Sequence, residues 1–136
     1  MAAEPDFDAL FAAAARVQAR AYAPYSRFKV GAAVLAEDGT IHAGCNVENA
    51  AYPEGSCAEA GAIAAMVAAG AGAIRAVLVY GEGAELVTPC GACRQRIREF
   101  APPETPVAIA GPEGLRARFT LAELLPASFG PANLPR

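Results

Sequence analysis

The sequence has neither a surplus of basic residues nor a long apolar segment, and these two absences argue against whole classes of protein. Its 11 Lys and Arg residues stand against 14 Asp and Glu residues, for a formal charge of −3. Binding long nucleic acid through its phosphates requires a basic surplus on one face, so that partner is not expected. The longest stretch without charge, residues 60–74, is rich in Ala and Gly. It is shorter than the roughly 20 apolar residues that span a bilayer, so no membrane partner is expected.

The N-terminal segment is acidic and lacks the basic-then-apolar pattern of a signal peptide, so we expect a cytoplasmic location. With 136 residues the chain has the usual size of one compact domain, predicted over residues 1–136. A chain of this size buries roughly two thirds of its unfolded surface and needs no metal or disulfide to hold its core. Disulfides are rare in the cytoplasm, so the four cysteines call for a metal or redox explanation first.

Apolar periodicity and turn signals predict nine elements in the order α-β-β-α-β-α-β-β-α. The first helix places Leu10, Phe11, Ala14, Val17 and Ala21 on one face, and Pro24 stops it. A hairpin follows around Asp38-Gly39. The remaining predictions are strands over 28–36, 41–47, 74–80, 107–110 and 117–120, and helices over about 57–69, 90–100 and 121–125. This order predicts an α/β fold with one mixed five-stranded sheet and helices on both faces, in three layers.

Three of the cysteines stand where two predicted helices begin. Cys90 and Cys93 form a C-x-x-C whose sulfurs lie on one helix face, and Cys57 opens the preceding helix. Helix N-termini carry partial positive charge, which favours thiolates. If the two helices enter from the same edge of the sheet, the three thiolates converge on one zinc ion. Three protein ligands leave the fourth zinc position open for water, the arrangement of a catalytic site.

Two further residues near this motif leave alternatives open. Glu59 points away from Cys57 and is predicted to stand beside the water as a general base, or else to complement the helix N-terminus. Cys45 would close a structural site of four thiolates, but its position inside a strand favours an inert buried thiol. The C-x-x-C taken alone also fits redox chemistry.

These residues belong to a longer sequence signature. Zinc deaminases carry His-or-Cys-x-Glu followed by Pro-Cys-x-x-Cys, and this chain has CAE at 57–59 and PCGAC at 89–93. Further similar segments are YAPYSRFKVG at 22–31, GCNVENAAY at 44–52, TPCGACRQ at 88–95, and Leu124-Leu125-Pro126 with Phe129. On these segments the chain resembles the small homotetrameric zinc-dependent cytidine deaminases over nearly its whole length.

The resemblance implies a cytidine deaminase-like fold and hydrolytic deamination of cytidine and 2′-deoxycytidine by a zinc-activated hydroxide, in pyrimidine salvage. It implies one Zn²⁺ per subunit on Cys57, Cys90 and Cys93, with Glu59 as proton shuttle. It also implies substrate contacts: Phe28 against the pyrimidine, the Ala58 backbone on the base, Asn46 and Glu48 on the ribose, and Ala50, Tyr52 and Phe129 reaching the pocket of a neighbouring subunit in a homotetramer.

Simple packing is an alternative role for Phe28, Tyr52 and Phe129. The rival functions are deamination of a related aminopyrimidine, nucleic-acid editing and a structural zinc module.

The sequence departs from the family pattern after the glutamate, where many members have an arginine that offsets the charge of the metal site and this chain has Ala60. Zinc with three thiolates carries a net charge of about −1. The two helix N-termini together supply roughly +1. Arg94 and Gln95 are further candidates for partial substitutes.

Overall fold

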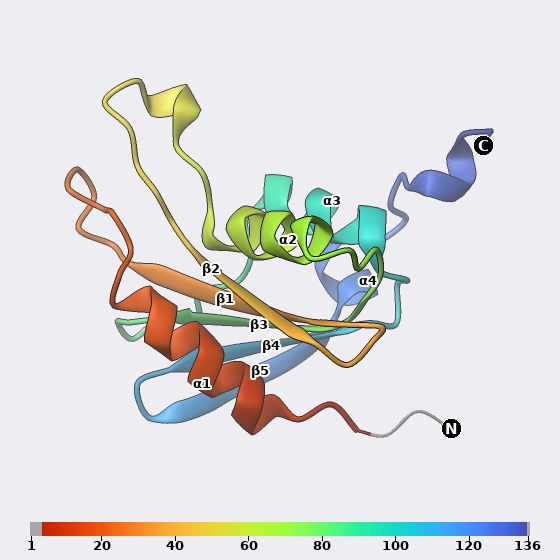
Figure 1. The fold of residues 1–136 in the computed structure, drawn as a ribbon, viewed down its shortest axis with the longest axis horizontal. Coiled ribbons are helices and arrows are strands. Elements are labelled where there is room, and N and C mark those ends of the chain that lie inside the picture. The colour runs from red at the N-terminus through yellow and green to blue at the C-terminus, as the bar shows by residue number, and fades with distance from the viewer. Residues whose placement is uncertain (1–3, 136) are drawn as a thin grey trace.

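The computed structural model describes residues 4–135; residues 1–3 and 136, the ends of the predicted domain, lie outside the described residues. Figure 1 labels the elements. The helices are α1 Phe7–Gln18, α2 Ala58–Ala68, α3 Gly91–Phe100 and α4 Leu121–Leu124, with short 3₁₀ turns η1 Tyr52–Glu54 and η2 Pro131–Asn133. The strands are β1 Val30–Ala36, β2 Ile41–Cys45, β3 Ile74–Gly81, β4 Pro106–Gly111 and β5 Gly114–Thr120. The predicted element order is confirmed.

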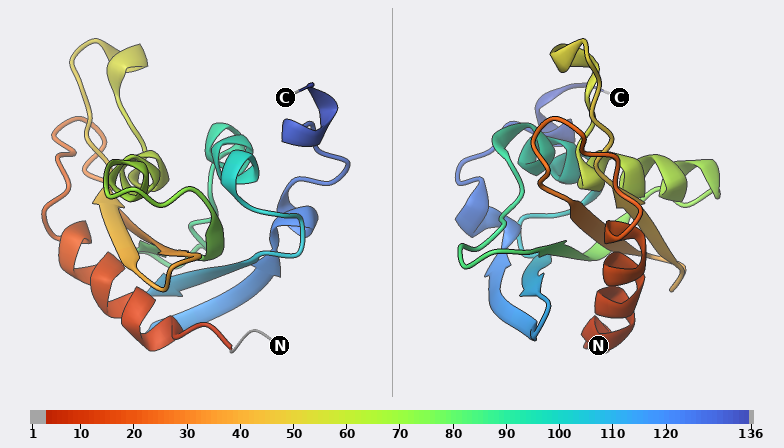
Figure 2. Two further views of the ribbon diagram at one scale, coloured as in Figure 1. Left: turned by 45° about the vertical axis from the view of Figure 1, so that its right-hand side comes forward. Right: turned by 90° about the vertical axis from the view of Figure 1, so that its left-hand side faces the viewer.

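The five strands form one mixed sheet in the order β2-β1-β3-β4-β5. β3 and β4 run parallel, and the other neighbouring pairs are antiparallel. Helix α1 covers one face of the sheet, and α2 and α3 lie side by side over the other (Figures 1 and 2). The predicted three-layer architecture is therefore confirmed.

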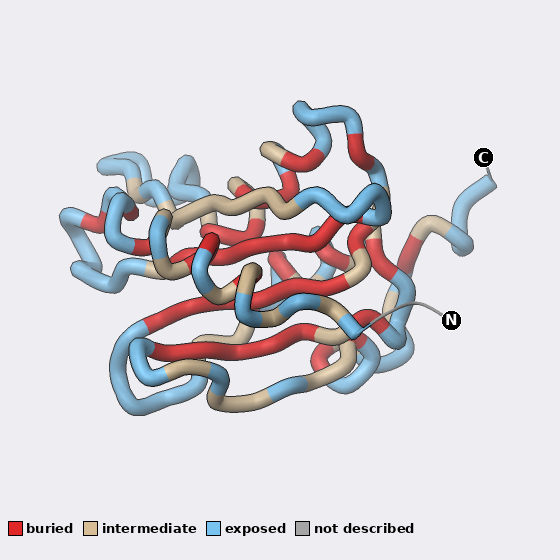
Figure 3. Tube along the Cα trace, turned by 60° about the horizontal axis from the view of Figure 1, so that its bottom comes forward, coloured by how far each residue is buried: buried red, intermediate tan, exposed pale blue. Residues whose placement is uncertain are grey.

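The central strand β3 is buried on both faces, as its continuous apolar run predicts. Val77 and Val79 pack in the core beneath α2 and α3. Leu78 and Tyr80 alternate with them and pack beneath α1. Figure 3 shows this burial running along the middle strands, so the sheet is a rigid base for the helices above it.

Helices α2 and α3 begin and end within one residue of their predicted bounds. Gly70, with φ of 98°, follows α2 in the left-handed conformation that glycine adopts at low cost. Gly44 of β2 lets α2 approach closely, because a Cβ there would lie 2.3 Å from the backbone nitrogen of Ala62. This contact fixes the start of α2 against the sheet.

The predicted bounds of the first helix and the first hairpin are wrong at their ends. Helix α1 stops at Gln18 because the backbone of Tyr22 pairs instead with the chain around Asn46, with the Tyr22 N–H donating to the Asn46 carbonyl at 3.0 Å. Strand β1 begins at Val30 rather than at Phe28, and β2 ends at Cys45. The predicted strand ends therefore form loops.

None of the helices in residues 4–135 has the length and apolar character that a membrane crossing requires.

Candidate functional site

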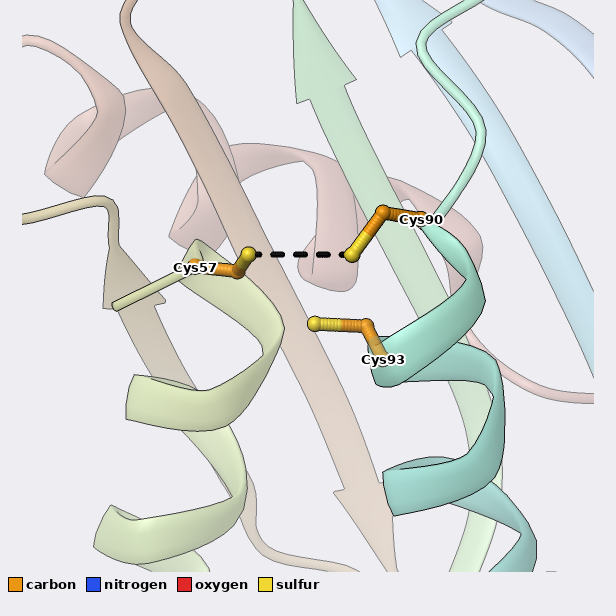
Figure 4. Close-up of side chains that lie close together, drawn as sticks. All are labelled: Cys57, Cys90 and Cys93. Atoms are coloured by element: carbon orange, nitrogen blue, oxygen red, sulfur yellow. Dashed lines mark hydrogen bonds between the residues drawn. The ribbon is translucent and has the colours of Figure 1, made fainter. Parts of the chain in front are cut away.

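Three cysteine sulfurs meet between the starts of α2 and α3 (Figure 4). Cys57 immediately precedes α2, Cys90 immediately precedes α3, and Cys93 lies in the first turn of α3. The Sγ atoms of Cys57 and Cys90 are 3.8 Å apart, and all three sulfurs lie within 4.8 Å of one another. Zn–S bonds of about 2.3 Å in a tetrahedron put the sulfurs roughly 3.8 Å apart. The predicted convergence of the three thiols is confirmed, and its geometry fits one zinc ion.

The three thiols differ in burial and in the ease with which they ionise. Burial raises the pKa of Cys57 and, more strongly, that of the fully buried Cys93. Burial of Cys90 acts in the same direction, but the Cys93 backbone N–H and the neighbouring thiol side chains outweigh it and lower the pKa of Cys90. Metal ligands must be deprotonated, so binding of a cation at this site releases protons from the buried thiols.

Cys45 lies on the opposite face of the sheet from this cluster. Its neighbour Gly44 faces α2, and successive strand residues point to opposite faces, so the Cys45 side chain points to the α1 side. Its partner across the ladder, Gly31, faces Ala14 of α1 in the same way. Within residues 4–135 the metal-binding cluster comprises the other three cysteines, so the four-thiolate alternative is wrong.

Glu59 is a buried carboxyl group beside the thiols. It is only 4% exposed, belongs to the first turn of α2 and lines the same pocket as Cys57 and Cys90. Burial raises the pKa of Glu59, while the positive charge of Arg96 acts in the opposite direction. A buried carboxyl group with a raised pKa is suited to accepting and returning a proton near neutral pH.

The pocket in front of the thiols has a volume of about 390 Å³, within the usual range for small-ligand sites. It contains five of the predicted substrate-contact residues: Phe28, Asn46, Glu48, Tyr52 and Ala58. The sequence did not single out its other wall residues, which are Val30, Val47, Gly55, Ser56, Val87 and Thr88. One pocket therefore joins the metal position to most of the predicted substrate contacts.

Asn46 spans the gap between the two strands of the hairpin. Its Oδ1 accepts the Val30 N–H at 2.8 Å, and its Nδ2 donates to the Phe28 carbonyl at 2.8 Å. Asn46 lies just beyond β2, which ends at Cys45, although the predicted strand over 41–47 includes it. An amide has two N–H donors and two acceptor lone pairs, so Asn46 keeps one of each for a ligand.

Glu48 anchors the loop that precedes Phe28. Its Oε1 accepts the backbone N–H groups of Tyr25 at 2.9 Å and Ser26 at 3.1 Å, and its Oε2 accepts the Ser26 hydroxyl. The Ser26 hydroxyl and then the backbone N–H groups lower the pKa of Glu48. Ser26 was not among the predicted site residues, although it lies within the family-like segment at 22–31.

The aromatic side chains around the pocket are exposed. Phe28 is 45% exposed and lines the pocket, so the packing alternative for Phe28 is wrong. Tyr52 is 75% exposed and contacts Tyr25, with 5.9 Å between the ring centroids. The segment with η1, which includes Tyr52, projects from the body of the molecule in both views of Figure 2. This chain alone therefore leaves the pocket open on the Tyr52 side.

The other two predicted contacts with a neighbouring subunit lie outside the pocket of this chain. Ala50 is exposed in the loop after β2, and Phe129 is exposed in the C-terminal segment. The Phe129 carbonyl accepts a hydrogen bond from Gln95 at 2.9 Å. Their contact with a second subunit stays a prediction.

The structure does not bring Arg94 or Gln95 to the sulfurs. Arg94 donates to the carbonyls of Pro89 and Leu124, each at 2.7 Å, and so ties the start of α3 to the end of α4. The side-chain amide of Gln95 donates a hydrogen bond to the Phe129 carbonyl in the C-terminal segment. The expectation that these residues offset the charge of the metal site is therefore wrong.

Arg96 does reach the cluster, although it was not among the residues predicted from the sequence. Its Nη1 donates to the Cys93 sulfur at 3.4 Å. Arg96 follows Cys93 by three residues on α3, the same spacing that separates Cys93 from Cys90. That spacing makes Arg96 a neighbour of Cys93 on the helix surface and is the one sequence signal that points to it.

Comparison with known proteins agrees with this geometry. A model of the cytidine and deoxycytidylate deaminase zinc-binding region matches residues 6–109. A cytidine deaminase of Sporosarcina psychrophila is 43% identical over 129 residues, covering 95% of each chain. A cytidine deaminase of Mycobacterium tuberculosis is 40% identical over 131 residues, covering 96% of this chain and 95% of that protein. The crystal structure of cytidine deaminase from Burkholderia pseudomallei superposes with a TM-score of 0.84 and 41% identity, over 92% of this chain and 100% of that one. The predicted fold is thereby confirmed.

Proposed function

The chain belongs to the cytidine and deoxycytidylate deaminase zinc-binding family, and from this premise we propose that it hydrolyses cytidine and 2′-deoxycytidine to the corresponding uridines and ammonia. The observation that carries the proposal is the meeting of three thiols and one buried carboxyl group at a single nucleoside-sized pocket. Cys57, Cys90 and Cys93 hold the zinc ion. A structural zinc module requires neither the open pocket nor the buried carboxyl group.

Glu59 moves the protons in the proposed reaction. Zinc held by the three thiolates supplies a water that is acidic enough to serve as the nucleophile. Carbon C4 of cytosine is a poor electrophile until ring nitrogen N3 is protonated. Glu59 takes one proton from the water and passes it to N3 while the water oxygen bonds to C4. Glu59 then takes the second proton, from the hydroxyl group now on C4, and delivers it to the amino group, so the C4–N bond breaks and ammonia departs as the C4 carbonyl forms. The burial of Glu59 supports this assignment, because burial favours the protonated form through which each transfer passes.

The remaining pocket residues hold the nucleoside. Phe28 packs against the pyrimidine, and the Ala58 backbone binds the base from the first turn of α2, where amide N–H groups have no acceptor within the helix. Asn46 and Glu48 bind the ribose through the hydrogen-bonding capacity that their loop contacts leave free. Holding C4 against the attacking water in this way supplies a large share of the rate.

The proposal includes a homotetramer in which Ala50, Tyr52 and Phe129 of one subunit reach the pocket of the next. The exposure of Tyr52 and Phe129, at 75% and 57%, supports it, because large exposed apolar side chains near an open pocket are suited to an interface. Pyrimidine salvage in the cytoplasm is the proposed setting.

An absorbance assay on the purified protein with cytidine, 2′-deoxycytidine, cytosine and CMP tests the function, alongside determination of bound metal. We expect about one zinc per chain, turnover of both nucleosides and poor turnover of cytosine, because free cytosine cannot engage Asn46 and Glu48. Zinc at that ratio with no turnover of any of the four compounds would contradict the deaminase proposal and favour the structural zinc module.

A further inference from the structure

The proposed zinc centre has an unbalanced charge. Three thiolates around a divalent ion leave a net charge of about −1, and negative charge on the ligands weakens the ability of the ion to acidify its water. The position after Glu59 is occupied by Ala60, which carries no charge. Besides the helix N-termini, a compensating positive charge must therefore come from another element.

Helix α3 provides a compensating positive charge. The guanidinium of Arg96 donates from Nη1 to the sulfur of Cys93 at 3.4 Å, and Cys93 is fully buried. A hydrogen bond from a charged donor is stronger than a neutral one, and burial of the acceptor reduces its screening by water.

No competing partner holds Arg96 elsewhere in the described part of the chain. Both ion pairs found in residues 4–135 involve other arginines, Arg116 with Glu113 and Arg118 with Glu4. The nearest alternative cation on α3, Arg94, is taken up by backbone carbonyls. Arg96 thus points its charge at a metal-ligating sulfur and forms no ion pair with an acidic residue of the described part of the chain.

We propose that Arg96 is a positioning residue of the metal site, which acts through the Cys93 sulfur and supplies from α3 the positive charge that Ala60 does not supply from α2. The inference rests on the proposed zinc site and adds to it. Loss of the guanidinium leaves the thiolate with its full charge, which makes the bound ion a weaker Lewis acid and lowers the rate of the chemical step. The nucleoside contacts lie on other elements, so binding of substrate changes little.

The test compares Arg96→Gln with Arg16→Gln, a matched loss of one positive charge near the end of α1, on the opposite face of the sheet. Changes next to metal ligands typically cost 10-fold to 100-fold, so we expect kcat of Arg96→Gln to fall at least about tenfold with KM nearly unchanged. We expect Arg16→Gln to match the wild type. Adding Ala60→Arg to Arg96→Gln restores most of kcat, because the charge returns from the α2 side.

A spectroscopic readout separates this inference from the proposed activity. In the cobalt-substituted protein, loss of a hydrogen bond to Cys93 raises the energy of the sulfur electrons, so the sulfur-to-cobalt charge-transfer band moves to longer wavelength in Arg96→Gln and not in Arg16→Gln. This shift is measurable even if the protein has no deaminase activity. If Arg96→Gln does not fold, Arg96→Lys, which keeps the charge, gives a smaller shift in the same direction. An identical band and identical kcat in both glutamine variants would overturn the role of Arg96. Where only Arg96→Lys folds, a band at the wild-type wavelength would overturn the action of Arg96 through its hydrogen bond to Cys93.

Discussion

The two halves of the pocket differ in what holds their residues in place. The metal half consists of the starts of α2 and α3, whose inner residues Ala62, Met66 and Ile97 are fully buried in the core. The half that faces the sugar consists of the loop before β1 and the chain after β2. That half is held to the sheet by the side-chain contacts of Asn46 and Glu48, and its aromatic residues are exposed.

This difference shows which part of the pocket a single chain can assemble without a neighbouring subunit. A helix anchored by its buried face fixes the position of every residue in its first turn, so one chain is enough to assemble the thiols. A loop fixed by a few hydrogen bonds and open to solvent on one side is completed only by further contacts, which the proposed neighbouring subunits supply. Substitutions in the metal half should therefore remove chemistry or zinc, and substitutions in the sugar half should alter binding and local stability.

The largest effect is expected from Glu59→Gln in the metal half. Loss of the proton shuttle lowers kcat by about 10²-fold to 10⁴-fold, the range typical of general acid–base groups, while the three thiols still hold zinc. Parallel measurement of kcat and zinc content checks this. Loss of zinc in this variant would make Glu59 a ligand, and full activity would remove it from the mechanism.

Asn46→Ala tests the sugar half. The substitution removes the two hydrogen bonds that hold Phe28 and Val30, so we expect unfolding free energy to fall by about 1–3 kcal/mol. We also expect kcat/KM to fall by about tenfold to 100-fold with zinc content unchanged, because the ribose contact and the placement of Phe28 are lost together.

Asn49→Ala is the control, since the Asn49 side chain bonds only within its own loop, to Ala51, and does not line the pocket. Urea denaturation and steady-state kinetics of the two variants make the comparison. Equal losses in both variants would contradict the assigned role of Asn46.

A smaller effect is expected from the pH dependence of the Glu48 contacts. The pKa of Glu48 is lower in the folded protein than in the unfolded chain. Its carboxylate therefore contributes stability that is fully present above the unfolded pKa and is lost as the pH falls through the folded pKa. We expect wild type to melt at a higher temperature than Glu48→Gln at pH 7, and the difference to shrink steadily below about pH 4.5. A difference that stays constant from pH 7 to pH 3 would contradict this linkage.

The smallest effect is expected from Cys45→Ala, on the opposite face of the sheet. Zinc content and kcat should match those of wild type, because the Cys45 side chain points to the α1 side. Loss of zinc from this variant would show that a fourth thiol reaches the metal.

The contrast between the metal half and the sugar half of the pocket also explains which parts of the structure the sequence predicts. The bounds of α2 and α3 follow from local signals such as Gly70 and the cysteines at the helix starts, and the spacing of Cys90 and Cys93 alone puts their sulfurs on one face. The ends of β1 and β2 are not predictable in this way, because the Asn46 amide, distant in sequence from Val30, decides them. Arg96 was not predicted for a related reason. Its spacing places it near Cys93, but whether its guanidinium binds the sulfur or points into solvent depends on the packed structure.

X-ray absorption at the zinc edge of the purified wild-type protein tests the open three-thiolate centre most directly. We predict three sulfur atoms at about 2.3 Å and one oxygen or nitrogen at about 2.0 Å from each zinc ion. A shell of four sulfur atoms, or a protein that does not retain zinc, would contradict it.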